Sequence, residues 1–228
     1  MELPKPCLYV VTEPSCPKAG SAAGSHLLVA IEALEGGADA IQFRNKDAAG
    51  GKELPFQEAL VVCNNIRRFC EARGKMFIVN DDLQLAKECG AHGVHLGQED
   101  LAKTGVAQAR QALGNEALVG ISASRLEEAL QAVADGADYV GYGPVFATES
   151  KNDAAKAAGL EGLKELRKEF DDDNVSIPII AIGGISEENA KEVMAAGADG
   201  IAVISAISRA DDPEKAARRL KQIISGEA

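Results

Sequence analysis

The sequence predicts a single (β/α)8 barrel over residues 1–228, an α/β fold in which eight parallel strands alternate with helices. Strand-like and helix-like segments alternate along the chain, and one short motif recurs four times. In addition, neither a change in composition nor a Pro/Gly/Ser-rich linker divides the sequence. These three observations together favour one barrel domain.

The recurring motif consists of Gly, Ala, Asp or His, any residue, and Ile or Val, and its copies begin at Gly37, Gly90, Gly136 and Gly197. Glycine suits the left-handed position that ends a helix, and Ile or Val suits the start of a buried strand. The copies lie 53, 46 and 61 residues apart, which leaves room for two strand–helix units between neighbours. Four copies therefore predict eight strands.

Short apolar runs give the individual strands, and helix-spaced segments lie between them. The expected strands are Cys7–Thr12, Ala40–Phe43, Met76–Asn80, Gly93–Leu96, Leu118–Ser122, Tyr139–Tyr142, Ile177–Ile182 and Gly200–Ile204. Helical spacing is clear in Phe56–Ala72, Leu126–Ala134, Leu160–Phe170 and Glu187–Ala196. A doubly wound open sheet is the alternative, but no GxGxxG sequence follows the first strand. The polar segment Pro144–Ala158 is a poor helix and is expected to form a long loop.

Composition and charge exclude several classes of protein. Apolar residues make up 46% and charged residues 26%, which is a globular balance, and no apolar run reaches the roughly 20 residues of a membrane helix. The start of the chain lacks a basic flank, so we expect no secretory signal. The net charge of −11 disfavours nucleic acid and anionic lipid as partners. Five cysteines without metal-binding spacing are typical of reduced thiols, so we expect a cytoplasmic protein.

Polar residues and glycines follow seven of the eight expected strands. In such a barrel the active site lies where the strands end, so these groups should meet on one face. They are Gln42–Lys46, Asn80–Asp82, His95–Asp100, Ser122, the segment with Thr148, Ser150 and Lys151, Gly183–Gly184, and Ser205.

Three cations among these residues indicate an anion site. Arg44 and Lys46 leave one strand end on the same side, and Lys151 adds a third positive charge. Such bases are usually surface residues, but a strand end in an acidic protein favours an anion ligand. Three converging cations suit a diphosphate better than a single phosphate.

Two carboxylates follow the neighbouring third and fourth strands. Asp81 and Asp100 beside the cations would suit Mg²⁺, which keeps water ligands and binds substrate phosphates. Taken singly, Asp81 fits a turn residue and Asp100 a helix N-cap. As a pair beside Arg44 and Lys46, we interpret them as metal ligands. His95 lies within a strand, where a packed, hydrogen-bonded histidine is expected rather than a catalytic base.

A second anion site is predicted after the seventh and eighth strands. Gly183–Gly184 would let a ligand approach the backbone, although a tight turn is the simpler interpretation of this pair. Free N–H groups at the following helix starts, near Ser205, are suited to phosphate. Barrels commonly bind phosphate at this place.

Seven motifs, in order along nearly the whole chain, resemble the thiamine-phosphate synthase family. They are Gln42–Lys46, Val79–Asp81, Gly93–Asp100, Gly120–Ser122, Gly141–Phe146, Ala181–Ile185 and Ala202–Ser205. The resemblance implies a (β/α)8 transferase of thiamine biosynthesis. It would join 4-amino-2-methyl-5-hydroxymethylpyrimidine diphosphate to 4-methyl-5-(2-phosphoethyl)thiazole, or its 2-carboxy form, with Mg²⁺. The products would be thiamine phosphate and pyrophosphate.

The resemblance also assigns residues to four roles. It implies catalytic roles for Arg44, Lys46, Ser122 and Lys151. Pyrimidine diphosphate would be bound by Gln42, Phe43, Arg44, Asn45, Lys46, Asn80, Ser122 and Lys151. Thiazole phosphate would be bound by Thr148, Glu149, Ser150, Gly184, Ile204 and Ser205. Asp81 and Asp100 would hold one Mg²⁺ per subunit.

Three positions depart from the family pattern, and two other functions remain open. Asn45 replaces an acid, Ser150 a threonine and Glu13 an aspartate. A sister enzyme that aromatises a thiazole tautomer is one alternative, but it carries a histidine where this chain has Pro144. The other is a non-catalytic barrel that binds a thiamine precursor, which would not need the two aspartates or Lys151. The expected partners are small-molecule substrates, and homo-oligomerisation is left open.

Overall fold

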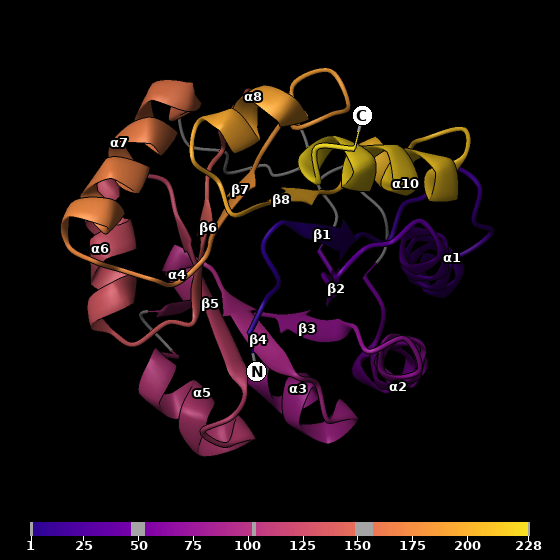
Figure 1. Cartoon of the computed structure of the whole chain (residues 1–228). Helices are drawn as coiled ribbons and strands as arrows, with labels where there is room; N and C mark the ends of the chain where they lie inside the picture. The colour runs from indigo at the N-terminus through magenta and orange to yellow at the C-terminus, as the bar shows by residue number, and fades with distance from the viewer. Residues whose placement is uncertain (1, 47–52, 102–103, 149–156, 228) are drawn as a thin grey trace.

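The computed structural model describes residues 2–46, 53–101, 104–148 and 157–227. Eight parallel strands close into a barrel in sequence order, and helices surround it (Figure 1). The strands are β1 (Cys7–Thr12), β2 (Ala40–Phe43), β3 (Met76–Asn80), β4 (Gly93–Leu96), β5 (Leu118–Ala123), β6 (Tyr139–Tyr142), β7 (Ile179–Ile182) and β8 (Gly200–Val203). This confirms the predicted (β/α)8 fold and excludes the open sheet.

The helices follow the strands as the sequence predicts, with two short additions. Those after strands are α1 (Ala22–Glu35), α2 (Phe56–Glu71), α3 (Leu83–Cys89), α5 (Val106–Leu113), α6 (Leu126–Ala134), α7 (Gly159–Asp172), α8 (Ala190–Ala195) and α10 (Pro213–Ile224). The additions α4 (Gln98–Leu101) and α9 (Ser205–Ser208) begin directly after β4 and β8. Both therefore lie at the carboxyl ends of strands, where the site was expected.

A few boundaries differ from the sequence prediction. β7 begins at Ile179 rather than Ile177, because Pro178 has no N–H to donate to the neighbouring strand. α8 begins at Ala190 rather than Glu187, because residues 187–189 form a turn first.

Alternation along each strand divides the core into two layers. On β1, Cys7, Tyr9 and Val11 pack inside the barrel, whereas Leu8 and Val10 pack against the helices. The outer layer is the larger, and it joins the barrel to the amphipathic faces of the helices. Burial of each such aliphatic side chain contributes about 1.5–3 kcal/mol before entropy costs, so this two-sided burial holds the strand ends in place.

The repeated motif has one structural role in all four copies. Its Asp or His caps the preceding odd-numbered strand by accepting a hydrogen bond from a backbone N–H. The four pairs are Leu8 N to Asp39, Phe77 N to His92, Val119 N to Asp138 and Ile179 N to Asp199. Each motif glycine has a positive φ, as expected for a helix end. The repeat therefore builds the amino-terminal end of the barrel, opposite the expected site.

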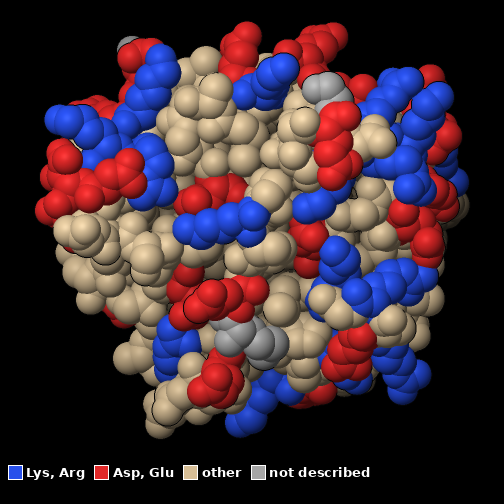
Figure 2. All heavy atoms as spheres, viewed as in Figure 1, with Lys and Arg blue, Asp and Glu red and all other residues tan. Residues whose placement is uncertain are grey.

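The molecular surface carries interspersed charges. Figure 2 shows Lys and Arg side chains among Asp and Glu side chains on the face in view, with neither sign forming one continuous patch. Within the described residues, none of the helices combines the length and the apolar character needed to cross a bilayer.

Candidate active site

A cavity of about 730 Å³ opens at the carboxyl ends of the strands. It receives residues from the ends of β2 to β8, so the polar groups that follow these strands do meet on one face. Among the residues lining it are Arg44, Lys46, Asn80, Asp81, Asp100, Ser122, Thr148, Gly184, Ile204 and Ser205. The prediction that residues after the strands meet on one face is confirmed, because they line one cavity.

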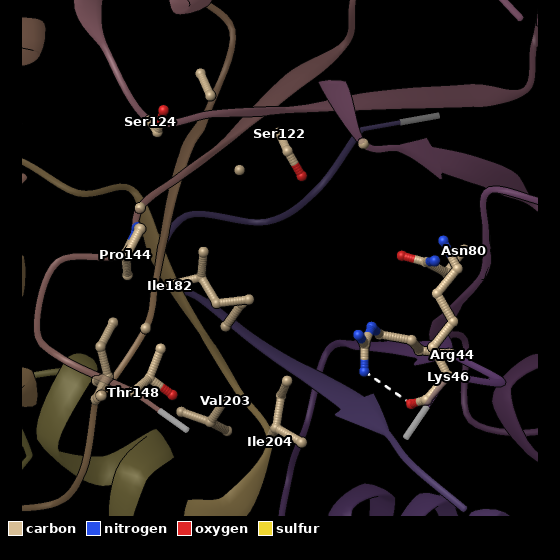
Figure 3. Close-up of a pocket in the computed structure, with 18 of the residues that line it drawn as sticks. Arg44, Lys46, Asn80, Ser122, Ser124, Pro144, Thr148, Ile182, Val203 and Ile204 are labelled. Atoms are coloured by element: carbon tan, nitrogen blue, oxygen red, sulfur yellow. Dashed lines mark hydrogen bonds between the residues drawn. The ribbon is translucent and has the colours of Figure 1, made fainter. Parts of the chain in front are cut away.

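The cavity has two chemically different sides. Figure 3 shows Arg44, Lys46 and Asn80 together on one side, and Thr148, Ile182, Val203 and Ile204 across from them. The first side is charged, and the second combines aliphatic side chains with glycine backbone. Two different ligand parts could therefore lie face to face across the cavity.

On the charged side, one lysine connects both predicted metal ligands. Lys46 Nζ lies 2.6 Å from Oδ2 of Asp81 and 3.7 Å from Oδ2 of Asp100. Arg44 donates from Nη1 to the backbone oxygen of Lys46 at 2.8 Å, which fixes the turn after β2 (Figure 3). The two contacts of Lys46 with aspartates join residues that are 35 or more positions apart in the chain.

Electrostatics hold this pair in its charged form. Burial alone would raise the pKa of Asp81, but hydrogen bonds from Lys46 and from the Gly97 N–H outweigh it and lower that pKa. Burial alone would lower the pKa of Lys46, but its hydrogen bond with Asp81 and the attraction of both aspartates raise it. Asp81 thus presents a carboxylate to any cation in the cavity.

The backbone at Asp81 has an unusual conformation. Asp81 has a φ of 60°, a left-handed conformation that is uncommon for residues other than glycine. Such strain concentrates at functional sites, where the surrounding structure enforces it. Its N–H donates to His95 O at 2.9 Å, and Gly97 N donates to its Oδ1 at 3.0 Å. The carboxylate is therefore fixed between β3 and β4.

These residues fit a hydrated divalent metal. A side chain at Gly97 would come within 3.3 Å of an Asp100 oxygen and 3.8 Å of an Asp81 oxygen, so glycine keeps the space between the carboxylates open. Among the described residues no three His, Cys, Asp or Glu side chains form a metal cluster. Two carboxylates, with water and phosphate oxygens completing the shell, are the donor set that Mg²⁺ commonly uses.

The described residues that line the cavity carry more negative than positive groups. The described lining holds two cations, Arg44 and Lys46, against five carboxylates, Glu53, Asp81, Glu99, Asp100 and Glu128. A net negative lining repels a diphosphate. A bound divalent cation would offset this repulsion.

On the opposite side, Gly183 and Gly184 bring backbone close to the cavity. Gly184 has a φ of 63°, and a Cβ there would lie 2.7 Å from Ala147 O and from Phe146 Cβ. The turn after β7 therefore packs against the segment after β6 too closely for a side chain at Gly184. Ser205 begins α9 at the edge of the same region.

A family model described as thiamine monophosphate synthase matches residues 8–207 of this chain. The chain belongs to the thiamine monophosphate synthase family. The match runs from β1 through α9 and so includes every strand of the barrel.

Similar proteins agree with this family assignment. The thiamine-phosphate synthase of Chloroflexus aurantiacus is 48% identical over 219 residues, which cover 96% of this chain and 92% of that protein. That of Methanocella arvoryzae is 44% identical over 96% of this chain and 94% of its own. A solved thiamine phosphate pyrophosphorylase from Pyrococcus furiosus superposes with a TM-score of 0.79 at 36% identity, covering 96% of each chain.

Not every residue predicted for the family site turns its side chain toward the cavity. Phe43 is buried behind β2, where its ring centroid lies 4.4 Å from that of His26. Asn45 bonds both backbone groups of Leu54, at 2.8 and 2.9 Å. Gln42 points into the barrel below the main cavity. Glu149, Ser150 and Lys151 lie outside the described residues, so their predicted roles stay predictions.

Gln98, one of the polar residues expected at the end of the fourth strand, lines the cavity and donates to the backbone oxygen of Ser122. The structure also adds two lining residues that the sequence did not single out, Glu53 and Glu128. Their positions after strands or in the next helix were visible, but their orientation was not. Glu13, a departure from the family pattern, is buried behind β1, where it accepts from Ser208 Oγ at 2.6 Å. It therefore anchors α9 from behind.

Proposed function

We propose that this chain joins 4-amino-2-methyl-5-hydroxymethylpyrimidine diphosphate to 4-methyl-5-(2-phosphoethyl)thiazole, forming thiamine phosphate and pyrophosphate. The family assignment supports the reaction class. The observation that carries the substrate assignment is the two-sided cavity, in which cations and carboxylates face an aliphatic and glycine-lined wall. One side suits a metal-bound diphosphate, and the other suits a second substrate with a phosphate tail.

On the charged side, we assign diphosphate binding to Arg44 and Lys46, with Lys151 as the third cation predicted by the sequence. Asn80 and Ser122 would orient the pyrimidine. Asp81 and Asp100 would hold Mg²⁺, which when bound neutralises charge on the departing diphosphate. The contacts of Lys46 support the use of Asp81 and Asp100 as cation ligands, because the Lys46 ammonium already lies near both carboxylates.

On the other side, we assign the thiazole phosphate to Thr148, Gly184, Ile204 and Ser205, together with Glu149 and Ser150. The aliphatic side chains of Ile182, Val203 and Ile204 would exclude water from the reacting carbon. The tight backbone at Gly184 supports a phosphate bound by N–H groups rather than by side chains.

The chemistry is a substitution at the methylene carbon of the pyrimidine. Its bond to the diphosphate oxygen breaks first, and the oxygen keeps the electron pair. The electron-rich aminopyrimidine stabilises the resulting carbocation. The thiazole nitrogen then supplies its lone pair to form the new C–N bond. Cations placed at the leaving group, and two substrates held face to face, account for the rate without a nucleophilic side chain.

One assay tests the function. Purified protein is given both substrates with Mg²⁺, and pyrophosphate and thiamine phosphate are measured, with the thiazole supplied with and without a 2-carboxylate. Formation of both products supports the proposal. Tautomer conversion without pyrophosphate would identify the sister activity, and binding without turnover would identify a sensor. Pro144 lines the cavity where the sister activity would need a histidine, which argues against that alternative.

The setting of the enzyme is also part of the proposal. Its substrates are small molecules, and we place it in the cytoplasm. All five cysteines are free and buried, which supports a reducing compartment.

A further inference from the structure

Below the main cavity, four hydrogen bonds join five side chains in a line across the barrel. Gln42 Nε2 donates to the Tyr9 hydroxyl at 2.8 Å, which lies 2.9 Å from the Tyr139 hydroxyl. The Tyr139 hydroxyl lies 3.1 Å from His95 Nδ1, and His95 Nε2 lies 2.9 Å from Ser122 Oγ. Of these five side chains, only Ser122 also lines the main cavity. Ser122 is one of the residues predicted to bind the pyrimidine substrate.

Glycines on the neighbouring strands make room for the rings of this line. A Cβ at Gly120 would lie 2.0 Å from Tyr139 Cζ, and a Cβ at Gly141 would lie 2.8 Å from His95 Cε1. Neither ring could therefore keep its place if these positions carried side chains. Gly120 and Gly141 lie in β5 and β6, within the family motifs of the sequence, so the motif glycines build this line.

The direction of each hydrogen bond follows from proton counting. Tyr9 and Tyr139 are 2% and 1% exposed, and burial raises the pKa of both phenols, so each keeps one proton. The Gln42 amide nitrogen is a donor only, so the Tyr9 oxygen accepts from it. Among the described residues the remaining partner of Tyr9 is Tyr139, so Tyr9 donates there.

Tyr139 and His95 carry the same hydrogen-bond direction on to the cavity. Tyr139 has accepted one hydrogen bond, and its own proton goes to His95 Nδ1. A neutral imidazole then carries its proton on Nε2, which donates to Ser122 Oγ. The Ser122 oxygen is thereby used as an acceptor, and its O–H remains available to the cavity. Figure 3 shows the Ser122 oxygen directed into this cavity.

We propose that Tyr9, Tyr139 and His95 are positioning residues that fix Ser122 as a hydrogen-bond donor toward the substrate. A donor at this place recognises an acceptor atom, such as a pyrimidine ring nitrogen, and disfavours an amino group. If the hydrogen bonds ran in the opposite direction, Ser122 would donate its proton to His95 Nε2. Its oxygen would then face the substrate as an acceptor and favour an amino group. The proposal rests on the proposed function only for the identity of the ring that Ser122 meets.

The first test reads the histidine tautomer without any substrate. The chain has three histidines, so long-range ¹H–¹⁵N spectra of labelled protein resolve them, and His95→Gln identifies the signal. We expect neutral His95 to carry its proton on Nε2 at about pH 8, above the usual imidazole pKa of about 6.5. A proton on Nδ1 would overturn the proposal. Because no turnover is needed, this result is independent of the proposed function.

The second test uses matched tyrosine variants on one strand. Tyr139→Phe removes the donor to His95, so the Nε2–H preference should weaken. Tyr142→Phe removes a hydroxyl from the same strand on its helix-facing side and should leave the tautomer unchanged. An unchanged tautomer in Tyr139→Phe would overturn the proposal. Thermal unfolding of both variants checks that they remain folded.

The third test measures kinetics. Tyr139→Phe should lower kcat/KM for the pyrimidine diphosphate about tenfold, the effect of one hydrogen bond, while the KM for the thiazole phosphate stays the same. His95→Leu should lower this kcat/KM by at least the same factor. His95→Gln should restore most of it, since the glutamine amide can still donate to Ser122. In a Ser122→Ala background, Tyr139→Phe should add nothing further. Additive losses in the double variant would overturn the proposal.

The kinetic and spectroscopic arms separate the two possible failures. Wild-type protein that makes no product would refute the proposed function, and the tautomer measurement would still decide the polarity of the line. Normal turnover with His95 protonated on Nδ1 would refute the polarity and leave the function intact.

Discussion

The ammonium of Lys46 lies 2.6 Å from Oδ2 of Asp81, although the two residues follow different strands and are 35 positions apart. The same ammonium lies 3.7 Å from Asp100. Lys46 therefore compensates two carboxylates that, in the proposed enzyme, would hold a metal. Metal binding would release this lysine toward the diphosphate, and the proposed metal and diphosphate sites would then be coupled through one side chain.

Activity should require Mg²⁺ or Mn²⁺. Asp81→Asn and Asp100→Asn should each raise the metal concentration needed for half-maximal rate, because each variant removes one charged ligand. Initial rates against metal concentration measure this, with Asp82→Asn as the matched control, since Asp82 caps α3 through the Leu85 N–H. Full turnover in excess EDTA would reject the metal, and normal metal curves in both ligand variants would reject these two ligands.

Substitutions on the two sides of the cavity should each raise the KM of a different substrate. Ser205→Ala should raise the KM for the thiazole phosphate about threefold to tenfold, because it removes one hydrogen bond to a charged group. Ser122→Ala should instead raise the KM for the pyrimidine diphosphate. Steady-state kinetics with each substrate varied in turn test the pair. An equal change for both substrates in both variants would contradict the two-sided assignment.

Gly184→Val should also weaken binding of the thiazole phosphate more than binding of the pyrimidine diphosphate, and it should lower the stability of the fold. Gly184 has a positive φ, and a Cβ there meets Ala147 O at 2.7 Å, so valine strains the loop as well as the phosphate site. We therefore expect a lower melting temperature together with the selective rise in KM. A rise in both KM values would show that loop distortion dominates.

Lys151→Ala should lower kcat more than it raises KM. Negative charge on the departing diphosphate oxygen is greater in the transition state than in the bound substrate, so a cation beside it acts mainly on kcat. Loss of one charge-assisted contact of about 2–3 kcal/mol corresponds to roughly 30- to 150-fold in rate. Lys151→Arg should recover part of this loss, because its planar group differs from a compact ammonium. An unchanged kcat, with chemistry rate-limiting, would show that Lys151 takes no part.

Asp39, at the opposite end of the barrel, should make stability depend on pH. Burial alone would raise its pKa, but hydrogen bonds from Lys221, Lys75 and the Leu8 N–H outweigh burial and lower it. A lowered folded-state pKa means that ionised Asp39 stabilises the fold above its unfolded pKa of about 3.9. This contribution is lost as the pH falls through the folded-state value.

Asp39→Asn should therefore cost about 2 kcal/mol of unfolding free energy at pH 7, because it weakens charged hydrogen bonds. The difference from wild type should shrink below about pH 4. Urea unfolding at several pH values measures it. Asp138→Asn, at the same motif position, should cost less because the Asp138 side chain is 30% exposed and pairs with a single arginine. A loss that does not vary with pH would contradict the assignment to Asp39 ionisation.

The sequence by itself determined the barrel and the face on which its site lies. Four copies of one motif implied eight strands, because each copy joins a helix end to a strand start. Polar residues after the strands implied a shared face, because all parallel strands of a barrel end on the same side. Local pattern suffices for these features, since both depend on neighbours in the chain.

Only the tertiary structure decided which side chains meet. Tyr9 and Tyr139 contact each other across 130 positions, and nothing local to either indicates its partner. The sequence assigned no role to the motif aspartates, and the fold gives them backbone N–H groups of another strand. Phe43 and Asn45 share a motif with Arg44, yet their side chains turn to the core and to Leu54. Side-chain direction depends on strand twist and on packing partners far along the chain, and a single sequence does not encode these in any short pattern.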